Sequence, residues 1–279
     1  MLYIGCHLSA SKGNCAMIRQ AMSLGANTFA FFTRNPRGSR AKAEDPQDCV
    51  QAVAMLEQEK FGKLVAHGAY TMNLSTAKEE DRSFAAQILA EDLRRMAALP
   101  GNFYNFHPGS HVGQGVEAGV DYISAALRKA LEPGYPVTVL LETMAGKGSE
   151  IGGSFQELKA ILDAVGSDQV GVCLDTCHVY DAGYDIRNDL DGVLAEFDRV
   201  IGLQRLKALH LNDSKNPFSS HKDRHERIGE GSLGVETFEK IVNHPLLREK
   251  PMILETPNEL PGYREEITLL RGLLKEKFI

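Results

Sequence analysis

Tryptophan is absent from this sequence of 279 residues, and cysteine is scarce. The five cysteines are an odd number, and Cys173 and Cys177 stand four positions apart rather than the three of a CxxC pair. The spacing indicates neither a disulfide framework nor a thiol redox motif. We therefore expect buried, reduced thiols and a cytoplasmic protein.

Long apolar runs are also missing. No segment approaches the roughly 18 apolar residues of a membrane-spanning helix, and MLYIGCHLSASKG at the start lacks the pattern of a signal peptide. No repeat, low-complexity tract or linker divides the sequence, which predicts one domain over residues 1–279. No large exposed apolar helix is indicated, so a monomer that does not bind membranes is expected.

Positive charge is in deficit. The sequence has 31 Lys and Arg against 37 Asp and Glu, which gives a formal net charge of −6. Taken alone, this argues against a nucleic-acid partner. Bound metal cations would change the sum.

Short apolar runs alternate with longer amphipathic segments along the whole chain. The expected strands are 2–6, 28–32, 63–66, 103–106, 137–141, 170–174, 206–209 and 251–254. The expected helices are 14–24, 46–60, 77–98, 116–131, 154–165, 189–203, 235–243 and 263–276. Runs rich in Val, Ile, Leu and Phe are typical of parallel strands buried on both faces. Eight strand and helix pairs predict an α/β protein, a (β/α)8 TIM barrel, in preference to an open doubly wound sheet.

Polar side chains with metal-binding chemistry follow these strands at the point where each one ends. They are His67, His107, Glu142, Asp175, His210 and Glu255, and the first strand ends at His7. The carboxyl ends of barrel strands open onto one face, where barrel enzymes build their active sites. Residues from distant segments are therefore expected to meet at one mouth.

Two further groups lie in the loops after the sixth and seventh strands. DTCH places His178 three residues after Asp175, and DRH places Asp223 two residues before His225. Imidazole and carboxylate ligands suit zinc and related divalent ions. One catalytic zinc needs about three protein ligands, so nine candidates indicate three ions with bridging carboxylates.

Less specific interpretations apply to each residue alone. A single histidine at a strand end is usually a hydrogen-bonded core residue, and a single buried carboxylate usually pairs with Arg or Lys. Four unpaired carboxylates at one mouth would repel one another, which favours bound cations.

Gly229 to Gly234 fits GxGxxG but is expected to be a loop leading into a helix, and 145–149 is expected to be a turn. His221 and His244 are expected to be solvated, and His111 to make a loop hydrogen bond.

The motifs together resemble those of the endonuclease IV family of apurinic/apyrimidinic endonucleases. The resemblance runs from YIGCHLSASKG to ILET at 253–256, through AHGAYTMNL, NFHPGSH, LLETMAGKGSEIG, VGVCLDTCHVYDAGYD, LHLND and DRHERIGEG. It implies three zinc sites: His67 and His107 with Glu142 as a bridge, then Asp175, His210 and Glu255, then His178, Asp223 and His225. Mn²⁺ is an alternative ion at one site.

The resemblance also implies the reaction and the substrate. Double-stranded DNA is cut 5′ to an abasic site by zinc-activated water, which leaves a 3′-hydroxyl and a 5′-deoxyribose phosphate. Glu142 is implied as general base as well as bridge, and similar enzymes also remove blocking groups from 3′ ends.

Arg37, Tyr70 and Asn73 correspond to the residues with which relatives enter and kink DNA. An inserted side chain replaces the stacking lost at the lesion. The loop here reads NPRGSR where some members carry glutamines, so Pro36 and Gly38 offer no side-chain hydrogen bonds.

Two other functions remain open at this stage. A sugar isomerase or epimerase of the xylose isomerase type uses one or two metals on the same kind of barrel, but leaves His178 and the DRH group without a role. A DNA-binding module that has lost catalysis would not require an intact ligand set.

Overall fold

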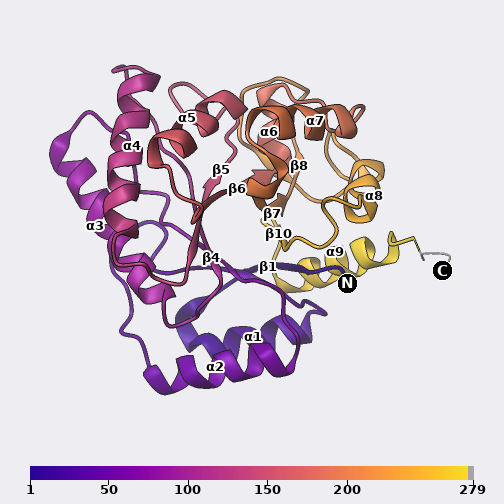
Figure 1. Ribbon diagram of the computed structural model, residues 1–279. Coiled ribbons are helices and arrows are strands. Elements are labelled where there is room, and N and C mark those ends of the chain that lie inside the picture. Colours follow the sequence, from indigo (N-terminus) through magenta and orange to yellow (C-terminus); the bar gives the residue numbers. More distant parts are fainter. Residues whose placement is uncertain (276–279) are drawn as a thin grey trace.

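Eight parallel strands close into a barrel in the computed structural model, which describes residues 1–275 (Figure 1). In chain order they are β1 (Ile4–Leu8), β2 (Ala30–Phe32), β3 (Val65–His67), β4 (Phe103–Phe106), β5 (Thr138–Glu142), β6 (Val170–Asp175), β7 (Leu206–Leu211) and β10 (Met252–Leu254). The barrel closes where β1 pairs with β10, with Ile4 opposite Met252. The predicted (β/α)8 fold is confirmed.

Helices surround the barrel and connect successive strands (Figure 1). They are α1 (Asn14–Ser23), α2 (Pro46–Gln58), α3 (Glu79–Met96), α4 (Val116–Leu131), α5 (Phe155–Val165), α6 (Thr176–Ala182), α7 (Leu190–Val200), α8 (Val235–Asn243) and α9 (Leu260–Gly272). Local sequence sets several ends: Asp45 caps α2 ahead of Pro46, Ser154 caps α5, and Gly166 ends α5 in a left-handed conformation.

Two apolar layers pack against the strands. The outer layer lies between strands and helices and includes Phe106, Phe155 and Phe197. The inner layer fills the barrel and is made of Ala30, Val65, Leu140, Cys173, Ala208 and Ile253, with Phe103 against it. The interior is thus a packed core, as in other TIM barrels, and it forms the floor beneath the carboxyl ends of the strands.

The structure differs from the sequence expectations in several places. The first strand is Ile4–Leu8 rather than 2–6, so His7 lies within it. The short helix α6 was not predicted, and neither was the two-stranded ribbon of β8 (Asp213–Ser214) and β9 (His225–Glu226). The last helix begins at Leu260 and ends at Gly272, and position 276 of its predicted range lies outside the described residues.

The cysteine prediction is confirmed, because all five thiols are free and buried. Within residues 1–275 no helix combines the length and the apolar character needed to cross a membrane.

Candidate metal centre

On each strand, the side chain that fills the barrel core and the side chain at the mouth above it are two positions apart. Side chains at positions i and i+2 of a strand share one face. Each inner-layer residue is therefore followed, two positions on, by a side chain at the mouth. These are Phe32, His67, Asn105, Glu142, Asp175, His210 and Glu255. The barrel geometry thus brings together residues from distant parts of the chain.

Glu142 lies at the centre of this layer and is fully buried. Its Oε2 lies 3.1 Å from His67 Nε2 and 3.5 Å from His107 Nε2. Its Oε1 lies 3.3 Å from His210 Nδ1 and 3.4 Å from His178 Nδ1. One carboxylate therefore contacts four imidazoles from four different segments.

Within residues 1–275, five overlapping groups have their ligand atoms within 4.8 Å of one another, and three of these sets together contain all nine predicted ligands. The other two groups are His67, His210 and Glu255, and Asp175, Cys177 and His225. The first set is His67, His107 and Glu142, the second is Glu142, Asp175, His210 and Glu255, and the third is His178, Asp223 and His225. These are the groupings that the family resemblance implies. Glu142 belongs to both the first and the second set, as a bridging ligand must.

The sets differ in their access to solvent. Glu142, Asp175 and His210 are fully buried, and the side chain of Glu255 is 11% exposed. In the third set the side chains of Asp223 and His225 are 32% and 19% exposed. In the first set the side chain of His107 is 27% exposed, so the first and third sets are both open to the mouth and the second is the most enclosed.

The titration behaviour of the cluster follows from its mixed charge. Burial opposes ionisation of Glu142, but His210 and His107 outweigh it and hold the pKa of Glu142 well below 4.5. Burial likewise opposes charge on Glu255, yet His210 brings its pKa well below 4.5. Conversely, the pKa of His210 lies well above 6.5 despite burial, because Cys173, Glu255 and Glu142 favour its cation. Asp175 and Asp223 raise the pKa of His178 in the same way.

Backbone carbonyls orient three of the imidazoles. Nδ1 of His67 lies 2.7 Å from the Gly68 oxygen, and Nδ1 of His178 lies 2.9 Å from the Thr143 oxygen. Nδ1 of His225 lies 3.2 Å from the Glu255 oxygen. Each Nδ1 donates in this arrangement, so Nε2 keeps its lone pair and points into the cluster. This outer hydrogen bond is the usual support of a metal-ligating histidine.

The donor set fits divalent metal ions in a second respect. Within residues 1–275 no lysine or arginine forms an ion pair with Glu142, Asp175, Asp223 or Glu255. Four carboxylates that only imidazoles neutralise are a costly arrangement in a buried site. Bound cations would satisfy it.

Two asparagines that the sequence analysis missed also orient the carboxylates. Asn212 donates from Nδ2 to Asp175 Oδ2 over 2.6 Å, and its Oδ1 accepts the backbone N–H of Glu255. Asn105 donates to Glu142 Oε2 over 2.5 Å. Asn105 and Asn212 each stand two positions from a predicted ligand, and this spacing was the available signal.

His7 also belongs to the mouth, although no role was predicted for it. Its Nε2 lies 3.1 Å from Glu255 Oε1, and its ring stacks on Phe32 with centroids 4.5 Å apart. Burial lowers the pKa of His7 below its ordinary value. His7 therefore packs beside Glu255 and Phe32 at the edge of the cluster.

Arg37 and Tyr70, two of the three predicted DNA contacts, are exposed at the mouth. Arg37 lies in the loop between β2 and α2. Tyr70 is 58% exposed, and its ring lies against those of Phe32, His67 and His107, with centroids 5.0 to 5.9 Å apart. The backbone N–H of Tyr70 donates to the Pro36 oxygen, which joins the two loops.

Asn73, the third predicted contact, is half-buried and already hydrogen-bonded. Its Oδ1 accepts from the backbone N–H groups of Ser75 and Ser110, and its Nδ2 donates to the Ser110 oxygen. The Asn73 amide therefore holds two mouth loops together. Nδ1 of His111 accepts from the N–H groups of Gly113 and Gly115, which confirms the predicted loop hydrogen bond.

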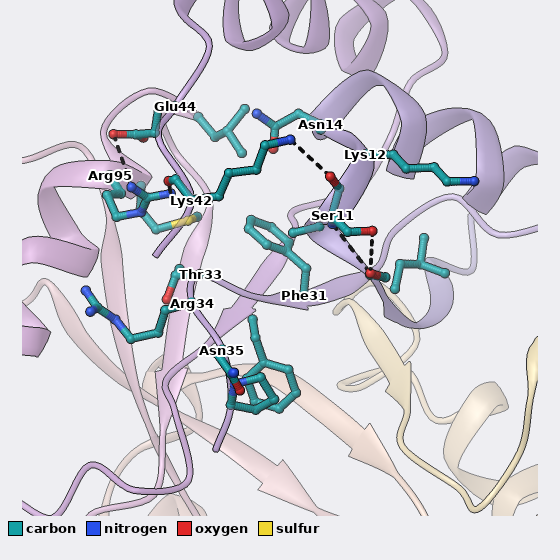
Figure 2. Close-up of a pocket in the computed structure, with 18 of the residues that line it drawn as sticks. Ser11, Lys12, Asn14, Phe31, Thr33, Arg34, Asn35, Lys42, Glu44 and Arg95 are labelled. Atoms are coloured by element: carbon teal, nitrogen blue, oxygen red, sulfur yellow. Dashed lines mark hydrogen bonds and ion pairs between the residues drawn. The ribbon is translucent and has the colours of Figure 1, made fainter. Parts of the chain in front are cut away.

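A cleft of about 750 Å³ opens beside this cluster and runs between the β1–α1 and β2–α2 loops. His7, Tyr70 and Glu255 line its inner end. Figure 2 shows Lys42 reaching across it, where its Nζ donates to the Ser11 oxygen over 3.0 Å. Other cationic side chains along its walls are Lys12, Arg34, Arg40 and Arg95.

The remaining histidines and the 145–149 segment have structural contacts. Gly146 and Gly148 adopt positive φ angles, as the predicted turn requires. His221 is exposed, with Nδ1 3.1 Å from the Ala145 oxygen. His244 was predicted to be solvated, but its side chain is only 14% exposed and pairs with Asp191 over 3.0 Å.

Known proteins resemble this chain along its whole length. The family described as "Xylose isomerase-like TIM barrel" matches residues 18–273. A "Probable endonuclease 4" of Alkaliphilus oremlandii is 59% identical and covers 100% of both chains. A protein of the same description from Clostridium beijerinckii is 58% identical over 98% of this chain and 99% of its own. The crystal structure of endonuclease IV from Thermus thermophilus superposes with a TM-score of 0.85 at 33% identity, over 97% of this chain and 98% of that one.

Proposed function

Because the chain belongs to the endonuclease IV family within the xylose isomerase-like TIM barrels, we propose that it is a zinc-dependent endonuclease of DNA repair. It hydrolyses the phosphodiester bond 5′ to an abasic site and leaves a 3′-hydroxyl and a 5′-deoxyribose phosphate. A 3′-end-cleaning phosphodiesterase activity accompanies incision. The observation that carries this proposal is the meeting of nine imidazole and carboxylate side chains in three sets at the barrel mouth.

Three zinc ions are the occupants that we propose for these sets. His67 and His107 hold the first ion, Asp175, His210 and Glu255 hold the second, and Glu142 bridges the two. His178, Asp223 and His225 hold the third. Zinc accepts mixed nitrogen and oxygen ligands, and Mn²⁺ can replace it at the most exposed set.

The reaction needs a nucleophile and stabilisation of the phosphate charge. When bound, the ions lower the pKa of water and neutralise the phosphoryl oxygens. Glu142, in contact with both halves of the cluster, is placed to accept a proton from the attacking water. His178, Asp223 and His225 face the mouth, where the leaving 3′-oxygen emerges.

The acidic composition is compatible with a DNA substrate. Glu142, Asp175, Asp223 and Glu255 account for four of the negative charges, and three divalent ions bring the net charge from −6 to about zero. Locally the mouth becomes positive by about two charges, which suits a phosphate backbone.

The DNA lies across the mouth and into the cleft. We assign Arg37 and Tyr70 to the gap in the base stack, because both are exposed on joined loops beside the cluster. Asn73 contributes by holding the loops after β3 and β4 together. Lys12, Arg40 and Lys42 contact phosphates along the cleft.

A sugar isomerase or epimerase is the alternative on this fold. Such an enzyme needs one or two ions, and the first and second sets would suffice for it. The third set has no function in that chemistry, although its side chains lie within 3.5 Å of one another. This observation favours the nuclease.

Two measurements on the purified protein separate these functions. Elemental analysis is expected to give close to three zinc ions per chain, and a duplex with a single abasic site is expected to be incised. One ion per chain, or turnover of ketoses without incision, would overturn the proposal.

A further inference from the structure

A glycine-rich loop encloses the side chain of Asp213, the first residue of β8, which is fully buried. Five backbone N–H groups donate to this one carboxylate. Oδ2 accepts from Gly229, Gly231 and Gly234 over 3.0, 3.2 and 3.2 Å, and Oδ1 accepts from Leu233 and Ser214 over 2.8 Å each. The N–H groups of the GxGxxG segment thus bind an internal carboxylate in the way that such loops elsewhere bind phosphate.

The loop closes tightly on this carboxylate. A Cβ at Gly231 would overlap both the Ser214 oxygen and Asp213 Oδ1, so only glycine fits there. Gly229 and Gly234 adopt φ angles of 85° and 74°, which favour glycine at these positions too. The three glycines of the motif are therefore explained by Asp213 and need no nucleotide ligand.

The enclosed carboxylate is joined directly to the third ligand set. The loop begins just after β9, which starts at His225 and pairs with β8 through only two residues on each side. One further backbone bond, from Lys215 N–H to the Arg224 oxygen, extends this ribbon. An isolated ribbon so short is marginal in water. The five bonds to Asp213 supply the anchor that the ribbon lacks.

His178, another ligand of the third set, is also linked to the segment that contains Asp213. His178 lies on α6, three residues before Asp181, and Asp181 Oδ1 accepts a hydrogen bond from Ser214 Oγ over 2.7 Å. Ser214 directly follows Asp213. The segment 213–214 is thereby bonded both to the helix that carries His178 and to the loop that follows His225.

We propose that Asp213 is a positioning residue that sets the geometry of the third metal site, although it contacts none of the three ligands. This inference rests on the proposed zinc cluster. It assigns Asp213 to the retention of one ion out of three, because every ligand of the first and second sets lies in a barrel strand or directly after one, whereas His225 lies in the ribbon.

Asp213→Asn is the most conservative test of the idea. The amide nitrogen must replace one of the two oxygens, so at least two backbone N–H groups would face a donor instead of an acceptor. Buried donors without an acceptor destabilise the conformation that contains them. The ribbon is expected to shift while the barrel keeps its fold.

The experiment counts the zinc retained by each protein against a graded series of a chelator, by elemental analysis. Wild type is expected to keep three ions up to a given chelator concentration. D213N is expected to lose one ion at a concentration about 10- to 100-fold lower, the range typical of changes around metal ligands, and to keep the other two. Asp92→Asn is the matched control: Asp92 is equally buried, but it lies on α3, outside the ribbon and its loop, and holds Arg34 and Tyr104. It is expected to retain all three ions like wild type.

Each outcome decides the question. Retention of all three ions by folded D213N with wild-type affinity would overturn the inference, and so would parallel loss of all three. If D213N fails to fold, the same chelator titration is carried out on Gly231→Ala. If neither variant folds, the loop is needed for folding of the whole protein, and the specific role at the third site is overturned. A wild-type protein with fewer than three ions would instead contradict the proposed cluster, so the two failures are distinguishable.

Discussion

His178 and His225 face each other with their Nε2 atoms 3.4 Å apart. Both rings direct Nδ1 toward a backbone oxygen, so both Nε2 atoms carry lone pairs when the rings are neutral. Two lone pairs cannot bond to each other, and a cation between them resolves the conflict. In the metal-free protein, burial opposes a proton on His178, but the nearby carboxylates of Asp175, Asp223 and Glu142 raise the pKa of this ring.

Zinc binding is accordingly expected to release protons. The pKa values of His178 and His210 lie above 6.5, so both rings carry protons near neutral pH that a metal must displace. Calorimetric titration of metal-free protein at pH 7, in buffers of different ionisation enthalpy, measures this release. A binding heat that does not vary between buffers would show that no proton is displaced.

The metal-free and zinc-loaded proteins are expected to differ in their pH optimum of stability. Histidines with raised pKa values contribute stability below about 6.5 that is lost as pH rises, and carboxylates with lowered pKa values contribute stability above about 4.5 that is lost as pH falls. The metal-free protein is therefore most stable between these limits. The loaded protein has its optimum at higher pH, because protons compete with zinc. Thermal unfolding across this range tests it, and coincident optima would contradict it.

Metal removal is expected to lower the melting temperature. An ion present at about 1,000 times its Kd contributes about 4 kcal/mol, which corresponds to roughly 10 °C in a protein of this size. Loss of the ions also leaves the four mouth carboxylates balanced only by histidines. Scanning calorimetry with and without a chelator measures the difference. An unchanged melting temperature would argue against metals bound to the folded state.

Glu142→Gln is expected to reduce incision by at least about 10²-fold, the usual effect of losing one electrostatic contact at a reacting centre. The amide keeps the shape of the side chain, so the protein is expected to fold. It cannot bridge two cations, so incision is reduced. Glu196→Gln is the matched control, since Glu196 lies on α7 and pairs with Arg199 at the surface. Incision by E142Q at the rate of E196Q would refute the bridging role.

Substitutions of Arg34 and Arg37, which are three positions apart, are expected to affect different properties: stability for Arg34 and substrate binding for Arg37. Arg34 is buried against Asp92 over 2.7 Å, and Arg34→Met should cost about 3–5 kcal/mol of stability because a buried carboxylate loses its partner. Arg37 is exposed, and Arg37→Ala should leave stability unchanged while raising KM for abasic duplex about tenfold, the loss of roughly one stacking contact.

Urea unfolding and steady-state kinetics separate the two effects. Arg199→Ala on α7 is the control, because Arg199 is 72% exposed and away from the cleft. Weakened binding in R199A as strong as in R37A would remove the assignment of Arg37.

The barrel and the convergence of its strand ends were predictable from the sequence because both depend on short-range patterns. Apolar strands end at polar residues, and the parallel barrel brings those ends together, so His67 and Glu255 could be assigned to one mouth without knowledge of any contact. The division of the candidate ligands into three sites came from the family resemblance. The spacing of two residues between the core layer and the polar layer is likewise readable from the strands.

Long-range hydrogen bonds and short elements were not predictable in this way. The roles of Asn105 and Asn212 depend on the direction in which each side-chain amide points, and the ion pair of His244 depends on Asp191, 53 positions away. Helix α6 is a single short element in which Asp175 caps the turn that carries His178, and its 7 residues are too few to show a helical periodicity. The ribbon of β8 and β9 is stabilised by Asp213 rather than by strand propensity.

One incision assay tests the proposed metal-dependent cleavage at an abasic site most directly. A duplex labelled at its 5′ end and carrying a single abasic site is incubated with the protein as purified, after chelation, and after zinc is restored. The account predicts a single cut 5′ to the lesion with an extendable 3′-hydroxyl, lost on chelation and recovered with zinc. A duplex left intact by the fully loaded protein, or cut equally well without metal, would contradict it.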